Sequence, residues 1–386
     1  GRLGDQFGRR RMFGIGLALF TIASLECGIA WNAEILVAAR LLQGVAAALM
    51  SPQVLSIIGV VYAGEDRIKA LSIYGLVLGL AAVGGQLIGG VLIEAGLGWR
   101  GCFLINVPVG VVALALLSRC VPESRAERAT RLDVTGTVLV TVALTAIVLP
   151  LVEGRQHGWP LWTWLSLAAA PVLLALFVRH VRHADDPLVD PALFRNRAVA
   201  AGLFTQIFFW SGQAAFFLVF ALYLQIGRGM GALESGLVFT IMAASYLVAS
   251  AKAPALTERH GRTLVAAGGT CLAAGHLALA LAVGEPLGAL IPGLILVGAG
   301  MGLCITSLTT TVMSVAATHP EHAGGASGAL NTVQQVGNAL GVAVTGVLFF
   351  GAADGGYGHA FQVSVLQLAA IGVVVAVLSR LLPRVA

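Results

Sequence analysis

The chain has 386 residues, of which 58% are hydrophobic and only 11% are charged, whereas a soluble domain carries roughly 25% charged residues. A water-soluble fold of this length could not cover so much apolar surface, so the bilayer must be the solvent. The net charge of +5 comes from Lys and Arg residues gathered in short connections, which is typical of membrane topology and gives no support to nucleic-acid binding.

Apolar stretches of about 20 residues separate the charge clusters, and a helix of that length crosses about 30 Å of hydrocarbon. The sequence therefore predicts an all-α, polytopic membrane protein with twelve transmembrane helices. Their expected spans are Met12–Trp31, Ile35–Val61, Ile68–Ile93, Cys102–Leu117, Val134–Val152, Leu161–Val178, Val199–Leu224, Ser235–Ala253, Leu264–Val283, Leu287–Val312, Ala326–Gly351 and Phe361–Leu382. The fourth span is short, and we expect its true start near Gly101 or earlier.

The basic residues predict an orientation. Nearly all Lys and Arg fall in alternate connections, beginning with Arg2, Arg9, Arg10 and Arg11, while only Arg100, Arg155 and Arg228 lie in the others. By the positive-inside rule both ends of the chain should be cytoplasmic, in a bacterial inner or plasma membrane.

Several kinds of chemistry have no signature in the sequence. The five cysteines show no CxxC pair and no partner histidine at ligand spacing, so we expect no disulfide, metal or cofactor. A Walker-type glycine loop, an HExxH motif and a GxSxG motif do not occur, which speaks against an ATP-driven pump or a membrane hydrolase. We therefore expect a protein that is not an enzyme.

Two parts of the chain are related by one constant offset, which predicts a duplicated helical bundle. The matched pairs are Leu3 with Leu256, Gly8 with Gly261, Arg9 with Arg262, Gly75 with Gly328, and Gly84 with Gly337. The predicted domains are the remainder of an N-terminal four-helix bundle at 1–119, a linker with two inserted helices at 120–197, and a C-terminal six-helix bundle at 198–386.

The opening turn, Gly-x-Leu-Gly-Asp-x-x-Gly-Arg-Arg, combines glycines that permit tight turning with arginines suited to an anionic inner surface. It resembles the cytoplasmic loop between the second and third helices of the major facilitator superfamily. The resemblance implies that Asp5, Gly8 and Arg9 form a latch that holds the two bundles together when the protein is open outward. It also implies that two helices precede Gly1, so that the sequence is truncated.

Arg40 lies among apolar residues of the second predicted helix, where a charge costs at least about 2.5–3.5 kcal/mol, so it should face the bundle interior or snorkel outward. Its surroundings resemble the superfamily's motif for proton coupling, with Gln43 and Gly44 matching beside it. Glu26 lies at similar depth in the preceding helix, and we expect it to pair with Arg40 and to carry a proton.

The third predicted helix is rich in glycines, which allow helices to approach closely. Its segment Gly84-Gly85-Gln86-Leu87-Ile88-Gly89-Gly90 resembles the motif that marks proton antiporters within the superfamily, with Gln86 in the place of the usual proline. The segment Gly98–Gly110, with Trp99, Arg100, Asn106 and Pro108, is similar to the fourteen-helix drug:proton antiporter family, whose plan accounts for the inserted pair of helices.

A set of polar residues could line a central cavity beside several aromatic residues, giving a weakly polar pocket for bulky amphipathic compounds. The polar candidates and their tryptophan are Gln206, Trp210, Gln213, Asn331, Gln334 and Gln335, and the aromatic neighbours are Phe208, Phe209, Phe216 and Phe217. Contact with lipid would explain many of the aromatic positions equally well.

The leading hypothesis is a secondary transporter, monomeric in the lipid bilayer, that exports small amphipathic drugs in exchange for protons by alternating access. A second hypothesis is export of an endogenous metabolite or antibiotic by the same mechanism. A third, from another class, is a channel or a non-transporting membrane scaffold, which would need neither the latch nor Arg40.

Overall fold

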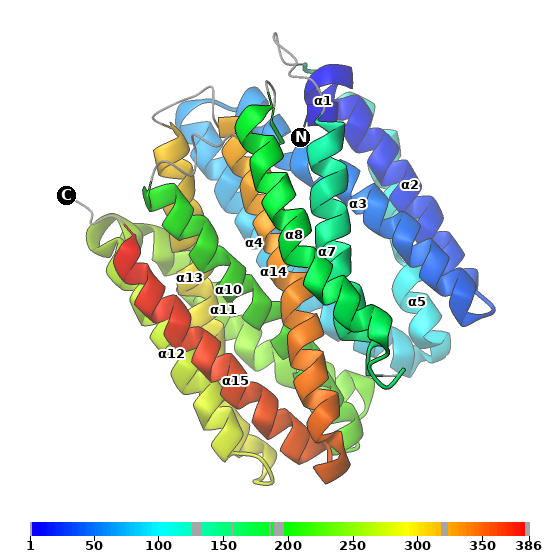
Figure 1. Ribbon diagram of the computed structural model, residues 1–386, viewed down its shortest axis with the longest axis vertical. Helices are drawn as coiled ribbons and strands as arrows, with labels where there is room; N and C mark the ends of the chain where they lie inside the picture. The colour runs from blue at the N-terminus through cyan, green and yellow to red at the C-terminus, as the bar shows by residue number, and fades with distance from the viewer. Residues whose placement is uncertain are drawn as a thin grey trace. The chain divides into compact units, whose positions relative to one another are not determined.

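In the computed structural model, the described residues are 2–125, 133–155, 157–184, 187–188, 197–317 and 323–382, and nearly all of them are helical (Figure 1). By length and composition, eleven helices in this part of the chain could cross a membrane, and the apolar helix Asn106–Cys120 is shorter. The all-α membrane fold predicted from the sequence is confirmed, and each predicted span lies within a helix of the structure or overlaps one.

The chain divides into two compact units, which we describe separately. The first comprises residues 1–132 with 231–237. Its helices are α1 (Arg2–Phe7), α2 (Arg9–Ile29), α3 (Ala33–Val61), α4 (Gly64–Leu92), α5 (Gly98–Leu104) and α6 (Asn106–Cys120), with a π-helical turn at Ile93–Leu97. α2 packs along α3 and also contacts α5 and α6.

Local sequence explains where these helices begin and end. Asn32 caps α3, because its side chain accepts a hydrogen bond from the Ile35 N–H at 2.8 Å. Gly96 and Gly98 have φ values of 82° and 59°, and this left-handed backbone produces a kink between α4 and α5. The span predicted at Cys102–Leu117 begins earlier, at Gly98, as we expected from its short length.

The second unit comprises residues 133–230 and 238–386. Its helices are α7 (Val134–Glu153), α8 (Leu161–His183), α10 (Arg197–Leu222), α11 (Ala232–His260), α12 (Arg262–Leu281), α13 (Ile291–Ala317), α14 (Ala323–Ala352) and α15 (Tyr357–Leu378), of which α11 begins in the first unit. α7 pairs with α8 and also contacts α14, so the inserted pair packs within this unit.

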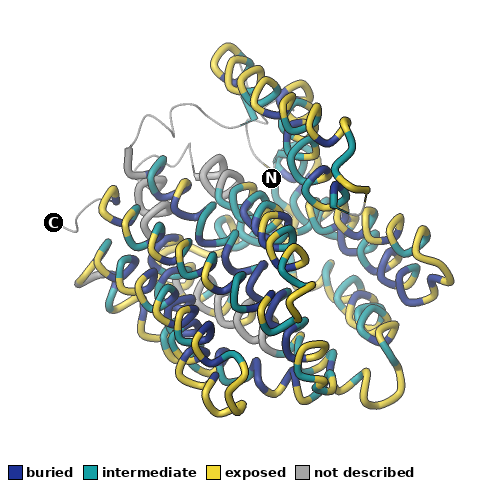
Figure 2. The backbone as a smooth tube through the Cα atoms, turned by 60° about the horizontal axis from the view of Figure 1, so that its bottom comes forward, coloured by how far each residue is buried: buried dark blue, intermediate teal, exposed yellow. Residues whose placement is uncertain are grey.

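Aromatic side chains fill the core of the second unit. The fully buried Phe216, Phe220 and Phe361 pack in succession, and the rings of Phe361 and Tyr223 stack at 4.4 Å. Along most helices, buried and exposed residues alternate, so that each helix has a covered side and an uncovered side (Figure 2). Tight aromatic packing of this kind gives the second unit a closely packed interior.

Candidate functional site

The opening segment of the chain forms a short helix, α1, and not the continuous turn that the glycines suggested. The break comes at Gly8, whose φ of 104° lies in a region that disfavours residues with a Cβ atom. Arg9 then begins α2, and its guanidinium bonds the Asp5 carboxylate at 2.7 and 3.0 Å across the break. Two of the predicted latch residues are therefore joined, and the third provides the bend between them.

Glu123, which follows α6, also contacts this loop. This contact was not predicted from the sequence. The Glu123 carboxylate oxygens accept hydrogen bonds from the backbone N–H groups of Arg10 (3.1 Å) and Arg11 (3.2 Å), at the N-terminus of α2. A Cβ atom on Gly8 would lie 2.7 Å from one of these oxygens, so a larger residue would displace the Glu123 carboxylate, and the positive φ of Gly8 itself favours glycine. Glu123 thus supplies the negative charge that a helix N-terminus favours.

The predicted repeat has a structural counterpart in the second unit. Gly261 has a φ of 49°, and Arg262 begins α12 directly after it, just as Gly8 precedes Arg9 and α2. Neither helix has a side-chain cap at this glycine. The two loops therefore share a glycine-determined break, a following arginine and a long apolar helix.

Arg40 is part of a polar chain within the first unit. Its Nη1 donates to the Gln43 side-chain oxygen at 2.6 Å, and Gln43 in turn donates to the Ser24 hydroxyl on α2 at 2.7 Å. Gln43 and Ser24 are buried, and the guanidinium lies 5.6 Å from the centre of the Phe103 ring on α5. One face of Arg40 remains exposed, so this charge is held by the bundle and is still accessible.

The expected ion pair between Glu26 and Arg40 does not form here. Among the ion pairs of the described residues none joins these two side chains, and the Arg40 guanidinium is directed to Gln43 instead. Glu26 is half-buried on α2, beside the buried Cys27. Equal depth on neighbouring helices was therefore not sufficient to predict an ion pair, because the amide of Gln43 provides Arg40 with a partner on its own helix.

The helix that carries the antiporter-like motif, α4, packs tightly against the first turn of α11. A Cβ atom on Gly90 would lie 2.8 Å from the Leu233 Cα atom, and one on Gly236 would lie 2.9 Å from the Gln86 carbonyl oxygen. A Cβ atom on Gly89 would lie 3.7 Å from the Cys102 sulfur, whereas one on Gly84 or Gly85 would meet no close neighbour outside the helix. The last part of the motif therefore serves close backbone packing.

The predicted cavity residues lie on two adjacent helices, α10 and α14. Gln206 and Gln213 are buried, and the Gln206 side-chain oxygen accepts a hydrogen bond from the Trp210 ring nitrogen at 2.6 Å. Asn331 and Gln334 are half-buried on α14, and Gln335 is exposed. A Cβ atom on Gly337 would lie 3.0 Å from the Trp210 Cβ atom, so α14 approaches α10 closely beside this group.

The four phenylalanines that were expected to line the cavity or to contact lipid instead belong to the core or pack against it. Phe209 and Phe216 are fully buried in the core of the second unit, where they face neither lipid nor a cavity, and Phe208 and Phe217 are half-buried against that core. A separate groove of about 460 Å³ opens between α11 and α13 of this unit. It is lined by Ile241, Ala244, Ser245, Val248, Ala249, Ile295 and Ala299.

The chemistry of this groove is almost entirely apolar. Its one hydroxyl, on Ser245, donates to the Ile295 carbonyl at 2.7 Å, so its proton is already engaged. The volume falls within the range of about 300–1,000 Å³ that small-molecule sites occupy. Sequence reasoning missed the groove because alanines and β-branched residues at these positions are equally typical of lipid-facing helices.

A polar cluster joins the two inserted helices. The Asp133 carboxylate accepts hydrogen bonds from the Gly136 N–H (2.7 Å) and the Leu188 N–H (2.9 Å), and it bonds the His180 ring nitrogen at 2.7 Å. Burial alone would raise the pKa of Asp133, but these hydrogen bonds outweigh it and the pKa is lowered. Within the described residues, no group of three or more His, Cys, Asp or Glu side chains could hold a metal ion.

Both units are bundles of long apolar helices, and each contains a glycine followed by an arginine that begins such a helix. The chain belongs to the Major Facilitator Superfamily, whose family model matches residues 1–342. This confirms the superfamily that the opening motif indicated, and it agrees with the expectation that the protein is not an enzyme.

Two bacterial proteins are similar to this chain over most of its length. The chain is 38% identical over 364 residues to the probable actinorhodin transporter of Streptomyces coelicolor, covering 91% of this chain and 63% of that protein. It is 33% identical over 347 residues to the multidrug resistance protein Stp of Mycobacterium tuberculosis, covering 89% of this chain and 64% of that one. The chain thus spans less than two thirds of the length of these two relatives.

Among solved structures, a POT family transporter in complex with a thioalcohol-conjugated peptide matches with a TM-score of 0.67. The match covers 97% of this chain and 82% of the other at 17% identity. At this identity the likeness concerns the fold alone.

Proposed function

We propose that the chain belongs to a secondary transporter that exports amphipathic, antibiotic-like compounds in exchange for protons by alternating access. The observation that carries the proposal is Arg40, a partly exposed charge in an apolar helix that donates to the buried Gln43, which in turn donates to the buried Ser24. A charge in a membrane span is costly, and its retention with fixed partners is typical of an ion or proton pathway.

In this proposal Arg40 responds to protonation of a nearby acidic group, for which Glu26 is the candidate on the neighbouring helix. The loop of Asp5, Gly8 and Arg9 acts as the cytoplasmic latch, and the segment from Gly84 to Gly90 favours antiport. The names of the two relatives, a probable actinorhodin transporter and a multidrug resistance protein, support export as the direction of transport.

The substrate is expected to be amphipathic, because the second unit offers two different kinds of surface. The groove between α11 and α13 would bind an apolar portion of the substrate, and its lining carries no charged side chain. The amides of Gln213 and Asn331 would contact polar atoms, since the Gln213 side-chain oxygen is buried without a partner among the described residues.

The test is dye efflux from membrane vesicles driven by an imposed pH gradient, with the protein expressed from its complete gene. We expect Arg40→Gln to reduce proton-driven efflux at least tenfold at unchanged expression. The matched control is Lys252→Gln, which removes another exposed cation from a membrane helix and should leave efflux unchanged. Equal efflux in both variants would contradict the role of Arg40, and dye that equilibrates but never accumulates would favour a channel.

A second candidate is export of an endogenous metabolite or antibiotic by the same mechanism, which the name of the probable actinorhodin transporter favours. Deleting the gene should then make the cell retain its own product without changing its resistance to unrelated drugs. Broad loss of drug resistance with normal secretion would instead favour multidrug export.

A further inference from the structure

A second groove lies on the exposed side of the second unit, between α12 and α15, and the proposed transport mechanism does not use it. Its volume is about 230 Å³. Ala266, Thr270 and Ala273 of α12 form one side, and Val373, Ala376, Val377 and Arg380 form the other. Thr270, Val373 and Val377 are exposed, so the groove opens outward from the bundle.

The groove exists because two glycines bring the helices together and small side chains flank them. A Cβ atom on Gly269 would lie 2.6 Å from the Ala376 nitrogen, and one on Gly372 would lie 2.7 Å from the Ala273 nitrogen. The backbones are therefore in contact, and the alanines beside them leave a furrow that Val373 and Val377 border. An exposed furrow between two transmembrane helices faces hydrocarbon.

The walls of the furrow offer nothing to a polar ligand. The Thr270 hydroxyl donates to the Ala266 carbonyl at 2.8 Å, so its proton is engaged within α12. The other wall residues along its length are alanine and valine. A hydrocarbon chain is the ligand that such a surface fits.

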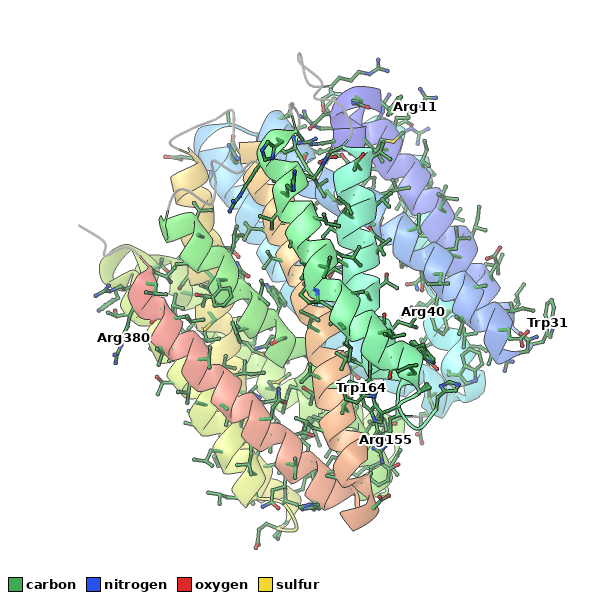
Figure 3. All side chains as sticks on the ribbon, in the orientation of Figure 1. Arg11, Trp31, Arg40, Arg155, Trp164 and Arg380 are labelled. Carbon is green, nitrogen blue, oxygen red and sulfur yellow. The ribbon has the colours of Figure 1, made fainter. Side chains whose placement is uncertain are left out.

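One end of the furrow, by contrast, is strongly basic. Arg380 lines the furrow where α15 ends, and Figure 3 labels it at that end. The Arg262 guanidinium donates to the Arg380 carbonyl at 3.0 Å, which brings the start of α12 to the same place. In the described part of the chain, no carboxylate forms an ion pair with either arginine.

We propose that this groove binds one molecule of an anionic glycerophospholipid, with an acyl chain in the furrow and its phosphate at Arg380 and Arg262. Guanidinium groups suit phosphate oxygens, and basic pockets between membrane helices attract anionic head groups. The basic end is the one predicted to be cytoplasmic. The proposal does not depend on the transport function, so failure of the efflux experiment would leave it standing.

A second copy of the chain fits this surface less well. In a membrane, two copies related by a two-fold axis have the same orientation, so Arg380 of each would approach Arg380 of the other. Two like charges brought close together oppose association. A single lipid satisfies both the apolar furrow and its basic end.

The test is native mass spectrometry of the purified chain with equal amounts of phosphatidylglycerol and phosphatidylcholine carrying identical acyl chains. We expect phosphatidylglycerol to be retained in preference, and Arg380→Gln to reduce that preference about fivefold, the effect of roughly one basic residue near an anionic head group. Arg262→Gln together with Arg380→Gln should abolish it. The matched control is Arg228→Gln, whose arginine bonds Tyr223 and the Glu285 carbonyl elsewhere in the unit.

Filling the furrow provides an independent readout. Ala273→Phe should lower retention of both lipids, and Thr270→Leu is a milder variant should the first fail to fold. Equal retention of the two lipids by the unaltered chain, or a preference that survives loss of both arginines, would overturn the proposal. Displacement of the lipid by free glycerol phosphate, with no effect of either filling variant, would show a simple phosphate site and would overturn it as well.

Discussion

Replacing Asp133 by alanine should destabilise the second unit by about 2–3 kcal/mol. The side chain caps the N-terminus of α7 through the Gly136 N–H, and loss of such a cap costs about 1 kcal/mol. It also accepts from the Leu188 N–H and bonds His180, which together add about 1–2 kcal/mol after allowance for the partial exposure of His180.

Asp133→Asn separates these contributions. The asparagine side-chain oxygen can still accept from Gly136, but the amide group cannot accept from Leu188, and the negative charge beside His180 is lost. We therefore expect about half the destabilisation of the alanine variant. Equilibrium unfolding in mixed SDS–detergent micelles, followed by circular dichroism, would measure both.

The same pair predicts a pH dependence. Because the pKa of Asp133 is lowered in the folded protein, its stabilising contribution is fully present above the ordinary carboxyl pKa of about 3.9 and is lost as the pH falls through the lower folded-state value. The difference in stability between the unaltered protein and Asp133→Asn should thus shrink below about pH 4. A difference that stays constant from pH 6 to pH 3, or an alanine variant as stable as the parent, would refute the assigned role of the carboxylate.

Two further predictions concern single positions. Gly8→Ala should lower the free energy of unfolding by about 1–2 kcal/mol because of the positive φ at this position. The new Cβ atom also approaches the Glu123 carboxylate, so the same substitution in a Glu123→Ala background should be less destabilising. A double-mutant cycle of unfolding energies would measure this, and identical costs in both backgrounds would contradict the contact. His276→Leu should stabilise the second unit by about 1 kcal/mol, because both ring nitrogens are buried and only one of them can reach the Leu272 backbone, so at least one lacks a partner among the described residues. Thermal unfolding in detergent would test it, and marked destabilisation would mean that the imidazole contributes bonds of its own.

The positions of the helices could be predicted from the sequence because the bilayer places one strong constraint on every membrane-spanning segment. Every span must be long, apolar and hydrogen-bonded within itself, so composition and length alone located them. Which face of a helix points inward was much harder to predict. The aromatic residues of α10 do not form a stripe along one side of the helix, and nothing in its sequence distinguished the core residues Phe209 and Phe216 from residues facing a cavity or lipid.

Contacts between distant segments were also beyond sequence reasoning. Glu123 caps α2 from more than a hundred residues away, and capping rules recognise only a residue directly before the helix. Asp133 and His180 meet for a similar reason, because α7 and α8 fold back on each other. Arg40 was singled out by its cost in a membrane, and the structure shows that its partner depends on side-chain reach, because Arg40 bonds Gln43 and not Glu26.

The repeat gives the clearest link from sequence to function. Gly8 and Gly261 both adopt left-handed backbone conformations, and each is followed by an arginine that begins a long apolar helix. The arginines have different partners, since Arg9 bonds the Asp5 carboxylate whereas Arg262 bonds the Arg380 carbonyl at the end of α15. The first loop therefore contains an ion pair of its own, while the second ties two membrane helices together beside the proposed lipid groove. A duplicated sequence element has thus kept a positive φ at its glycine in both units, with ψ values of 127° at Gly8 and −123° at Gly261, and its side-chain chemistry has diverged.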